Sequence, residues 1–392
     1  MIPILLIRFE KLEQRSRISV CSRFRKDVSS YYNWTLPYPD LNGSCTQPTY
    51  DIATDNNNAL RELNYMRWLV GFDTTTVLDE NFNDQVVQCA MNCAANGRLD
   101  HYPSPTSKCY TGPAFWGCRF SNLAAAGAIL NAPNALQQLI EDSGDNNLEV
   151  GHRRWIFYNG LKRTTFGGAY DSQSPLYQCA VAQRVVFGDD TPLQVLPFTA
   201  YPPPGYFPAQ FVYSRFSFWA PGIPSNAEFN ISVKINDEPQ NLTEKYSFAR
   251  VDVGDGVGGV MFSFANYIRF SKIVNKRIDI QIKCADKVYD YTIYPIDCSD
   301  KPMRTPVPTI EGDDYDKLDI GEAPKQKRQK KVAIGAGVGV SLVVIVIIIL
   351  VLFIVFRHGC SHNHDNDETN NNNNNNDNND DHSDSGENHL ED

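Results

Sequence analysis

Two histidines lie in segments where polar and large apolar side chains meet. His101 ends the segment AANGRLDH, and His152 lies within DNNLEVGHRRWIFY. Histidine changes charge near neutral pH and is a common metal ligand, so a fold that brings the two rings together would support acid–base or metal chemistry. A histidine that follows a helix end is more often a hydrogen-bonded structural residue. The spacing alone leaves both interpretations open.

The chain before His101 has the pattern of two amphipathic helices. Apolar side chains recur at helical spacing in residues 55–71 and again in residues 79–96. Asp55 or Asn56 would cap the first helix, and Gly71 and Gly97 would end the first and second helices. Two further helices are predicted, one over SNLAAAGAILN and one over residues 133–142.

Short β-prone runs follow these helices. RRWIFY, TTFGGAY and CAVAQRVVFG are separated by turn residues, and we expect them to form strands. On this interpretation Trp155, Ile156 and Phe157 begin a core strand and do not form a ligand site. Helices followed by strands over residues 51–195 predict a layered α/β domain.

The residue pattern changes after this domain. YPPPGYFP, at residues 201–208, is expected to lack regular structure and to mark a domain boundary. Alternating apolar residues at 229–235 and 278–282, followed by VYDYTIYPI, predict a small antiparallel β-sandwich over residues 196–298. Residues 1–50 are expected to be irregular, and their short apolar run is a weak signal segment.

The C-terminal part predicts a membrane anchor. Residues 299–331 read as a stalk, and residues 332–356 form an uncharged apolar stretch long enough to cross a bilayer as a transmembrane helix. The Asn-rich tail over residues 357–392 is predicted to be disordered. It holds ten Asp and Glu residues, which account for the formal net charge of −10. The rest of the chain is close to neutral, so we predict no nucleic-acid partner.

Two signals disagree about the orientation in the membrane. KQKRQKK before the apolar stretch, against Arg357 after it, places the N-terminal part in the cytosol by the positive-inside rule. Of the ten cysteines, eight lie between Cys45 and Cys298, and an even number spread across a folded region favours disulfides in an oxidising compartment. Because a long domain with an upstream signal translocates regardless of such flanks, we predict a single-pass type I protein of the cell membrane or endomembrane, with its N-terminal domain outside.

Several modification sites follow from this orientation. The disulfide candidates, whose pairing the sequence does not give, are Cys45, Cys89, Cys93, Cys109, Cys118, Cys179, Cys284 and Cys298. Cys21 would be left over. The glycosylation candidates are Asn33, Asn42, Asn230 and Asn241, each in an Asn-x-Ser/Thr sequon. Cys360, just past the apolar stretch, is a candidate for palmitoylation.

Five motifs in register resemble one protein family. LNYMRWLVG, AANGRLDH, SNLA, VGHRRWI and YPPPGYFP occur in the order and spacing of the CAP superfamily. These SCP-like extracellular proteins include cysteine-rich secretory proteins, antigen 5 and plant pathogenesis-related proteins, and the chain is most similar to the bacterial and protist branch. The resemblance covers residues 55–190, and residues 200–298 more loosely. It implies an α-β-α sandwich of CAP type with a cleft, followed by the small antiparallel β-sandwich.

The resemblance also implies a tetrad of two histidines and two acidic residues in the cleft. His101 and His152 match the histidines, and Asp142 matches one acid, with Glu141 as the fallback. Ser121 stands where the family has its other glutamate. Two imidazoles and one carboxylate can hold Zn²⁺ or another divalent metal together with a water. A serine hydroxyl cannot replace the missing carboxylate as a general base near pH 7.

Two arginines next to His152 bear on this metal prediction. Arg153 and Arg154 would disfavour a cation if they pointed into the cleft. Alternatively, they would pair with Glu149 or Asp142.

Three functions are consistent with these features. We expect a membrane-anchored, non-catalytic cell-surface protein that binds a lipid, a sterol or an extracellular protein through the cleft. The alternative is a metal-dependent or serine hydrolase of peptidase type that acts from the same cleft. The chain has neither the G-x-S-x-G elbow nor the HExxH motif that would mark such an enzyme. A third interpretation is a coat or adhesion element with a vestigial cleft.

Overall fold

The structure, a computed structural model, describes residues 5–7, 15–28, 35–128, 130–188, 194–224, 226–248, 258–264 and 273–299. All of them fall within one compact unit, Met1–Pro324. Apart from Ser299, the predicted stalk, apolar stretch and tail lie outside these ranges, as do Asn33 and Cys360. Within these ranges no helix has the length and apolar character needed to cross a bilayer.

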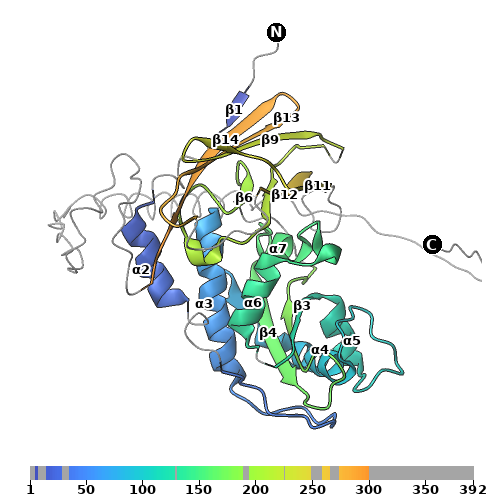
Figure 1. The fold of residues 1–392 in the computed structure, drawn as a ribbon. Coiled ribbons are helices and arrows are strands. Elements are labelled where there is room, and N and C mark those ends of the chain that lie inside the picture. Colours follow the sequence, from blue (N-terminus) through green and yellow to red (C-terminus); the bar gives the residue numbers. More distant parts are fainter. Residues whose placement is uncertain are drawn as a thin grey trace, which may run out of the picture. The chain divides into compact units, whose positions relative to one another are not determined.

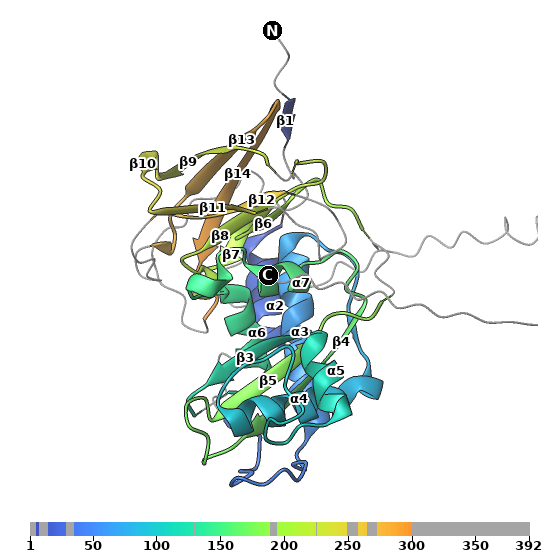
Figure 2. The same cartoon turned by 90° about the vertical axis from the view of Figure 1, so that its right-hand side faces the viewer.

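The described chain is a mixed α/β structure of helices and three sheets (Figures 1 and 2), as the sequence predicts at this level. The helices are α2 (Arg17–Asp27), α3 (Ile52–Val70), α4 (Asn83–Asn96), α5 (Gly112–Arg119), α6 (Ala132–Glu141) and α7 (Gly151–Ile156). Short 3-10 turns are η1 (Glu80–Phe82), η2 (Asp145–Asn147) and η3 (Ala209–Phe211). The first sheet has the order β2-β4-β5-β3, with β2 (Val77–Leu78), β4 (Arg163–Tyr170), β5 (Cys179–Arg184) and β3 (Ser121–Ala126).

The other two sheets pack against each other. The larger has the order β1-β14-β13-β9-β10, with β1 (Leu5–Ile7), β14 (Lys287–Ile296), β13 (Ile278–Cys284), β9 (Phe229–Ile235), β10 (Glu238–Gln240), and β7 (Gly205–Pro208) also on β14. The smaller has the order β11-β12-β8-β6, with β11 (Glu244–Phe248), β12 (Gly259–Ser263), β8 (Phe216–Trp219) and β6 (Thr199–Tyr201). Ring contacts such as Phe218–Tyr289, with centroids 4.7 Å apart, join the two sheets. Their strands pair antiparallel except that β1 and β7 run parallel to β14.

Helices cover both faces of the sheet β2-β4-β5-β3. On one face α4 packs on β4 and β5, where Val86 lies in the same apolar cluster as Ala180. On the other face α3 and α6 pack over Phe166. Two glycines of β4 lie against close neighbours, one in α4 and one in the segment before α3. A Cβ on Gly167 would lie 2.6 Å from a backbone nitrogen of α4, and one on Gly168 would lie 2.0 Å from the ring of Tyr38.

The predicted helix ends are partly confirmed. Gly71 and Gly97 end α3 and α4, and Gly97 adopts the left-handed conformation with φ 64° that favours glycine. α3 begins earlier than predicted, because Asp51 and not Asp55 caps it by accepting a hydrogen bond from the Thr54 amide. Asp55 instead lies inside the helix and is buried.

Three predicted elements are wrong. SNLAAAGAILN begins as strand β3 and not as a helix, because it pairs with β5 and its small side chains fit a sheet covered on both faces. GHRRWI forms helix α7 and not a strand, although Ile156 and Phe157 are buried as expected. YPPPGYFP has regular structure, since it contains the end of β6, a cis Tyr201–Pro202 bond and all of β7.

Two helices were not expected. α2 lies in the N-terminal region predicted to be irregular, with Ser16 as its N-cap. α5 begins after Thr111, whose side chain accepts a hydrogen bond from the Ala114 amide, with a proline in its first turn.

The structure corrects the disulfide set. Cys21, expected to be left over, pairs with Cys298, and the other bridges are Cys45–Cys109 and Cys89–Cys118. The remaining candidates in the described ranges are buried free thiols, namely Cys93, Cys179 and Cys284. They lie in apolar layers, where cysteine behaves as a small hydrophobic residue.

Candidate functional site

Asp142 and His152 form a close pair between α6 and α7. Asp142 follows α6 as its C-cap, in the left-handed conformation with φ 54°. One carboxylate oxygen lies 2.8 Å from His152 Nδ1, and the other accepts a hydrogen bond from the Arg153 amide at 3.1 Å. The Asp142 side chain is fully buried, whereas that of His152 is 23% exposed. An ionised carboxylate only accepts, so a neutral His152 carries its proton on Nδ1 and leaves the Nε2 lone pair free.

His101 is held in the same tautomer by a different partner. Its Nδ1 lies 2.9 Å from the carbonyl oxygen of Cys118, which can only accept a hydrogen bond. The residue is exposed, and within the described ranges no hydrogen bond to its Nε2 occurs. In their neutral form both imidazoles therefore donate a hydrogen bond from Nδ1, and Nε2 is the nitrogen that can accept one.

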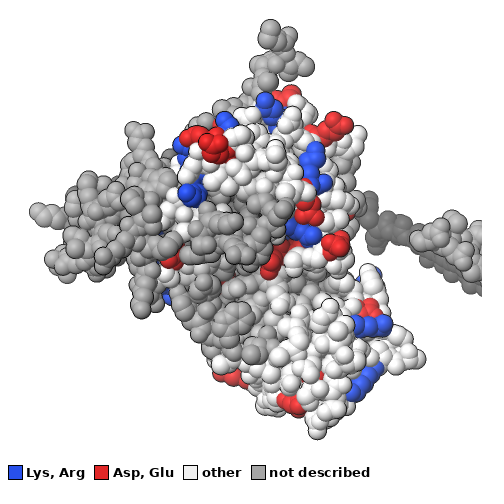
Figure 3. Space-filling view, in the orientation of Figure 1, with Lys and Arg blue, Asp and Glu red and all other residues white. Residues whose placement is uncertain are grey.

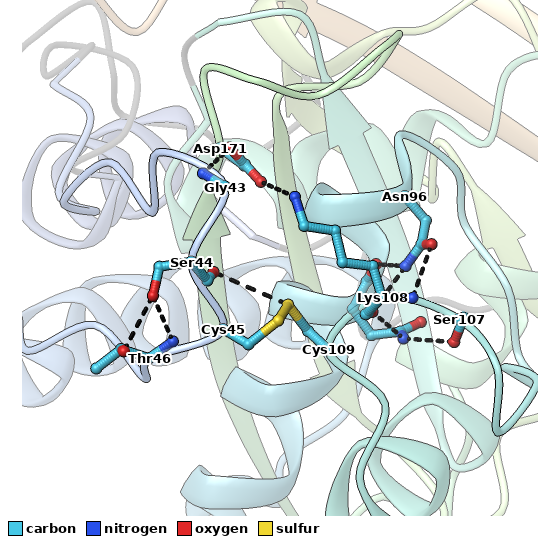
Figure 4. The surroundings of a disulfide bond; sticks show 10 residues. Gly43, Ser44, Cys45, Thr46, Asn96, Ser107, Lys108, Cys109 and Asp171 are labelled. Atoms are coloured by element: carbon cyan, nitrogen blue, oxygen red, sulfur yellow. Dashed lines mark hydrogen bonds and ion pairs between the residues drawn. A yellow bond between two sulfur atoms is a disulfide. The ribbon is translucent and has the colours of Figure 1, made fainter.

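The loop between α4 and α5, which carries His101, is fixed at its far end (Figure 4). Cys109 of this loop forms a disulfide with Cys45, and Asn96 of α4 donates a hydrogen bond to the carbonyl oxygen of Lys108 at 2.9 Å. These ties restrict the loop although most of its side chains are exposed.

One short segment contacts both histidines. Cys118 accepts the His101 bond, and the Asn122 amide donates to the backbone carbonyl oxygen of His152 at 3.2 Å. Ser121 lies between these two contacts, is only 4% exposed, and its hydroxyl has no hydrogen-bond partner in the described structure. A serine nucleophile needs a hydrogen bond to its base, and neither imidazole forms one with Ser121.

The side chains of Arg153 and Arg154 bind other groups of this chain. The buried Arg153 guanidinium donates to the carbonyl oxygens of Ile140 at 2.6 Å and of Arg215 at 2.9 Å. Arg154 pairs with Glu149 at 3.2 Å, one of the two partners that the sequence suggests.

Within the described ranges neither histidine belongs to a group of three closely spaced metal-ligand atoms. Zinc sites in proteins use three or four protein ligands. In the described ranges, the one group of at least three His, Cys, Asp or Glu ligand atoms lying within 4.8 Å of one another is Cys89, Cys93 and Cys118. Since Cys89 and Cys118 form a disulfide, this group does not offer three thiolates in that state.

Exposed aromatic side chains lie beside His101. Tyr102 is 65% exposed and Trp116 is 47% exposed. The guanidinium of Arg119 lies 5.7 Å from each ring centroid, within reach of a cation–π contact. Figure 3 shows acidic and basic residues interspersed among the described residues of one face.

Comparison of the chain with family models, curated proteins and solved structures finds no match.

The structure shows two hydrogen-bond partners of the histidines that the sequence did not indicate. They are the carbonyl oxygen of Cys118, which bonds His101, and the side-chain amide of Asn122, which bonds the backbone of His152. A backbone carbonyl leaves no signal in a sequence. Asn122 stands in the quoted SNLA motif, but its role depends on where α7 lies.

Proposed function

We propose that this chain is a non-catalytic extracellular binding protein, with a CAP-type domain over residues 51–195 and an anchor over residues 332–356. The observation that carries the non-catalytic part is the state of Ser121. In the described structure its hydroxyl is buried and has no hydrogen-bond partner, so Ser121 is not a nucleophile hydrogen-bonded to the His152–Asp142 pair. A carboxylate–histidine pair fixes the orientation of the imidazole ring, and a fixed ring can contact a bound partner as well as take part in catalysis.

Two features support the extracellular, CAP-type interpretation. Three disulfides bridge the described residues, which fits an oxidising compartment. The antiparallel strands β4, β5 and β3 lie between helices on both faces, the arrangement that the resemblance implies.

We favour a protein partner over a lipid or sterol. Trp, Tyr and Arg are the residues that contribute most to protein–protein binding energy. Trp116, Tyr102 and Arg119 stand together on the surface beside His101. In the described structure Arg119 has no acidic partner, so it is available to a carboxylate of the bound protein.

Two measurements on the full-length protein test this function. Peptide and ester turnover should stay at background in the wild type and in the H101A/H152A variant. Turnover that disappears in the variant would establish the hydrolase instead. Protease protection in intact membranes should place residues 1–330 on the lumenal or outer face, and a cytosolic location would contradict the proposal.

A further inference from the structure

A groove in the β-sandwich contains a glycosylation sequon in its wall. Its volume is about 750 Å³, within the range of cavities that hold small ligands. The residues that shape it include Phe229, Asn230, Ile231, Leu242, Lys245 and Lys283. It belongs to the sheets after residue 220 and does not include the histidines.

The groove lies between the two sheets of the sandwich. Lys245 of β11 donates a hydrogen bond to the carbonyl oxygen of Phe229 on β9 at 3.1 Å, across from one sheet to the other. Asn230 of β9 is the register partner of Lys283 on β13, so the two side chains are neighbours on the sheet. Both lysines are exposed, and neither forms an ion pair with any described residue.

The sequon Asn230-Ile231-Ser232 is presented outward. Because side chains alternate along a strand, Asn230 and Ser232 share one face of β9, and both are exposed. We propose that Asn230 carries an N-linked oligosaccharide whose first sugars occupy this groove. The inference rests on the proposed extracellular function, because glycosyl transfer to asparagine takes place on the lumenal side.

The covalent step needs one co-substrate, an oligosaccharide linked to a lipid diphosphate. Asn230 Nδ2 attacks the anomeric carbon, and the new N–C bond forms as the C–O bond to the diphosphate breaks. The lipid diphosphate leaves with the bonding electron pair, and the proton lost from Nδ2 neutralises the base of the transferring enzyme.

The groove has the chemistry of a sugar-binding surface. Lys283, the register partner of Asn230, lies on the same face of the sheet and can donate hydrogen bonds to the hydroxyl and acetamido oxygens of a sugar attached there, while Leu242 and Lys245 line the groove beside it. Covalent attachment at the groove wall gives the sugar a high effective concentration, so weak contacts suffice to hold it there.

Two variants at one position provide a matched test in the full-length protein made in secretory cells. S232A destroys the sequon and S232T preserves it, while Asn230 stays in place in both. We expect S232A alone to lose one glycan by mass. We also expect its melting midpoint to lie below that of S232T by roughly 2–4 °C, the scale typical of a modest stability change in a chain of this size.

Enzymatic deglycosylation of the native protein tests occupancy of the groove. The Asn230 glycan should resist removal until the protein is denatured, whereas a glycan on the exposed Asn42 should be removed from the native protein. Equal removal from both sites would overturn the inference. Glycans at Asn42 and Asn241 without one at Asn230 would overturn it while leaving the lumenal location intact. An unglycosylated protein would overturn both.

Discussion

Arg153 provides the sharpest test of how the site is built. Its guanidinium is fully buried and makes four hydrogen bonds, which join the end of α6 to β8 of the sandwich. The acceptors are the carbonyl oxygens of Ile140, Glu141 and Arg215 and the hydroxyl of Ser217. The perturbation is R153M, which keeps much of the volume and removes every donor.

The expected magnitude comes from two opposing effects. Hydrogen bonds to a charged group contribute about 1.5–3 kcal/mol each, so four of them contribute roughly 6–12 kcal/mol. Burial lowers the pKa of Arg153, which shows that holding the cation there is costly. That desolvation cost is several kcal/mol and is recovered when the charge is removed. We therefore expect a net loss of about 3–5 kcal/mol in the free energy of unfolding.

The assay is urea unfolding with the disulfides intact, followed by tryptophan fluorescence. A lower midpoint at unchanged slope reports a loss of stability. R98M is the matched control, because Arg98 is 61% exposed and its pair with Asp100 is worth about 0–1 kcal/mol. If R153M unfolded at the same midpoint as R98M, the guanidinium would not be holding α6 to the sandwich, and the reasoning would be refuted.

Two further predictions concern a buried acid and a disulfide. Burial raises the pKa of Asp55 to about 6, above the value of about 3.9 that is usual for aspartate. Between these two pH values the folded state binds the proton more tightly than the unfolded state, so stability falls as pH rises from about 4 to about 6, by roughly 3 kcal/mol. D55N should flatten this slope in unfolding curves measured at a series of pH values, and an unchanged slope would assign the effect to another group. The Cys21–Cys298 bridge closes a loop of 277 residues and so restricts the unfolded chain. From this loss of chain entropy, we expect C21A/C298A to lower the free energy of unfolding by up to about 5–6 kcal/mol. C284A, which removes a buried free thiol, should lower the free energy of unfolding much less. An equal decrease in both variants would contradict the loop-closure argument.

Elements with a strong local pattern could be predicted from sequence. Apolar spacing and glycine stops predict α3 and α4, a further helix is predicted at residues 133–142 where α6 forms, and β-prone or alternating runs predict β4, β5, β9, β13 and β14. SNLAAAGAILN was misassigned because small residues favour a helix locally, whereas β3 satisfies its backbone by pairing with β5. RRWIFY has strand-like residues, yet α7 forms there because buried Arg153 finds carbonyl acceptors on other elements. In both cases tertiary contacts outweighed local propensity.

The sequence by itself determined which residue types could form the site. His101 and His152 stand in quoted motifs, whereas Asp142 is proposed by the family resemblance with Glu141 as the fallback, and the chemistry of all three follows from their side chains. Only the tertiary structure decided that Asp142 binds His152 Nδ1, that the Cys118 carbonyl sets the tautomer of His101, and that Cys21 pairs with Cys298. A hydrogen bond to a backbone carbonyl and a bridge across 277 residues depend on distances that the whole fold sets. No local pattern of side chains encodes those distances.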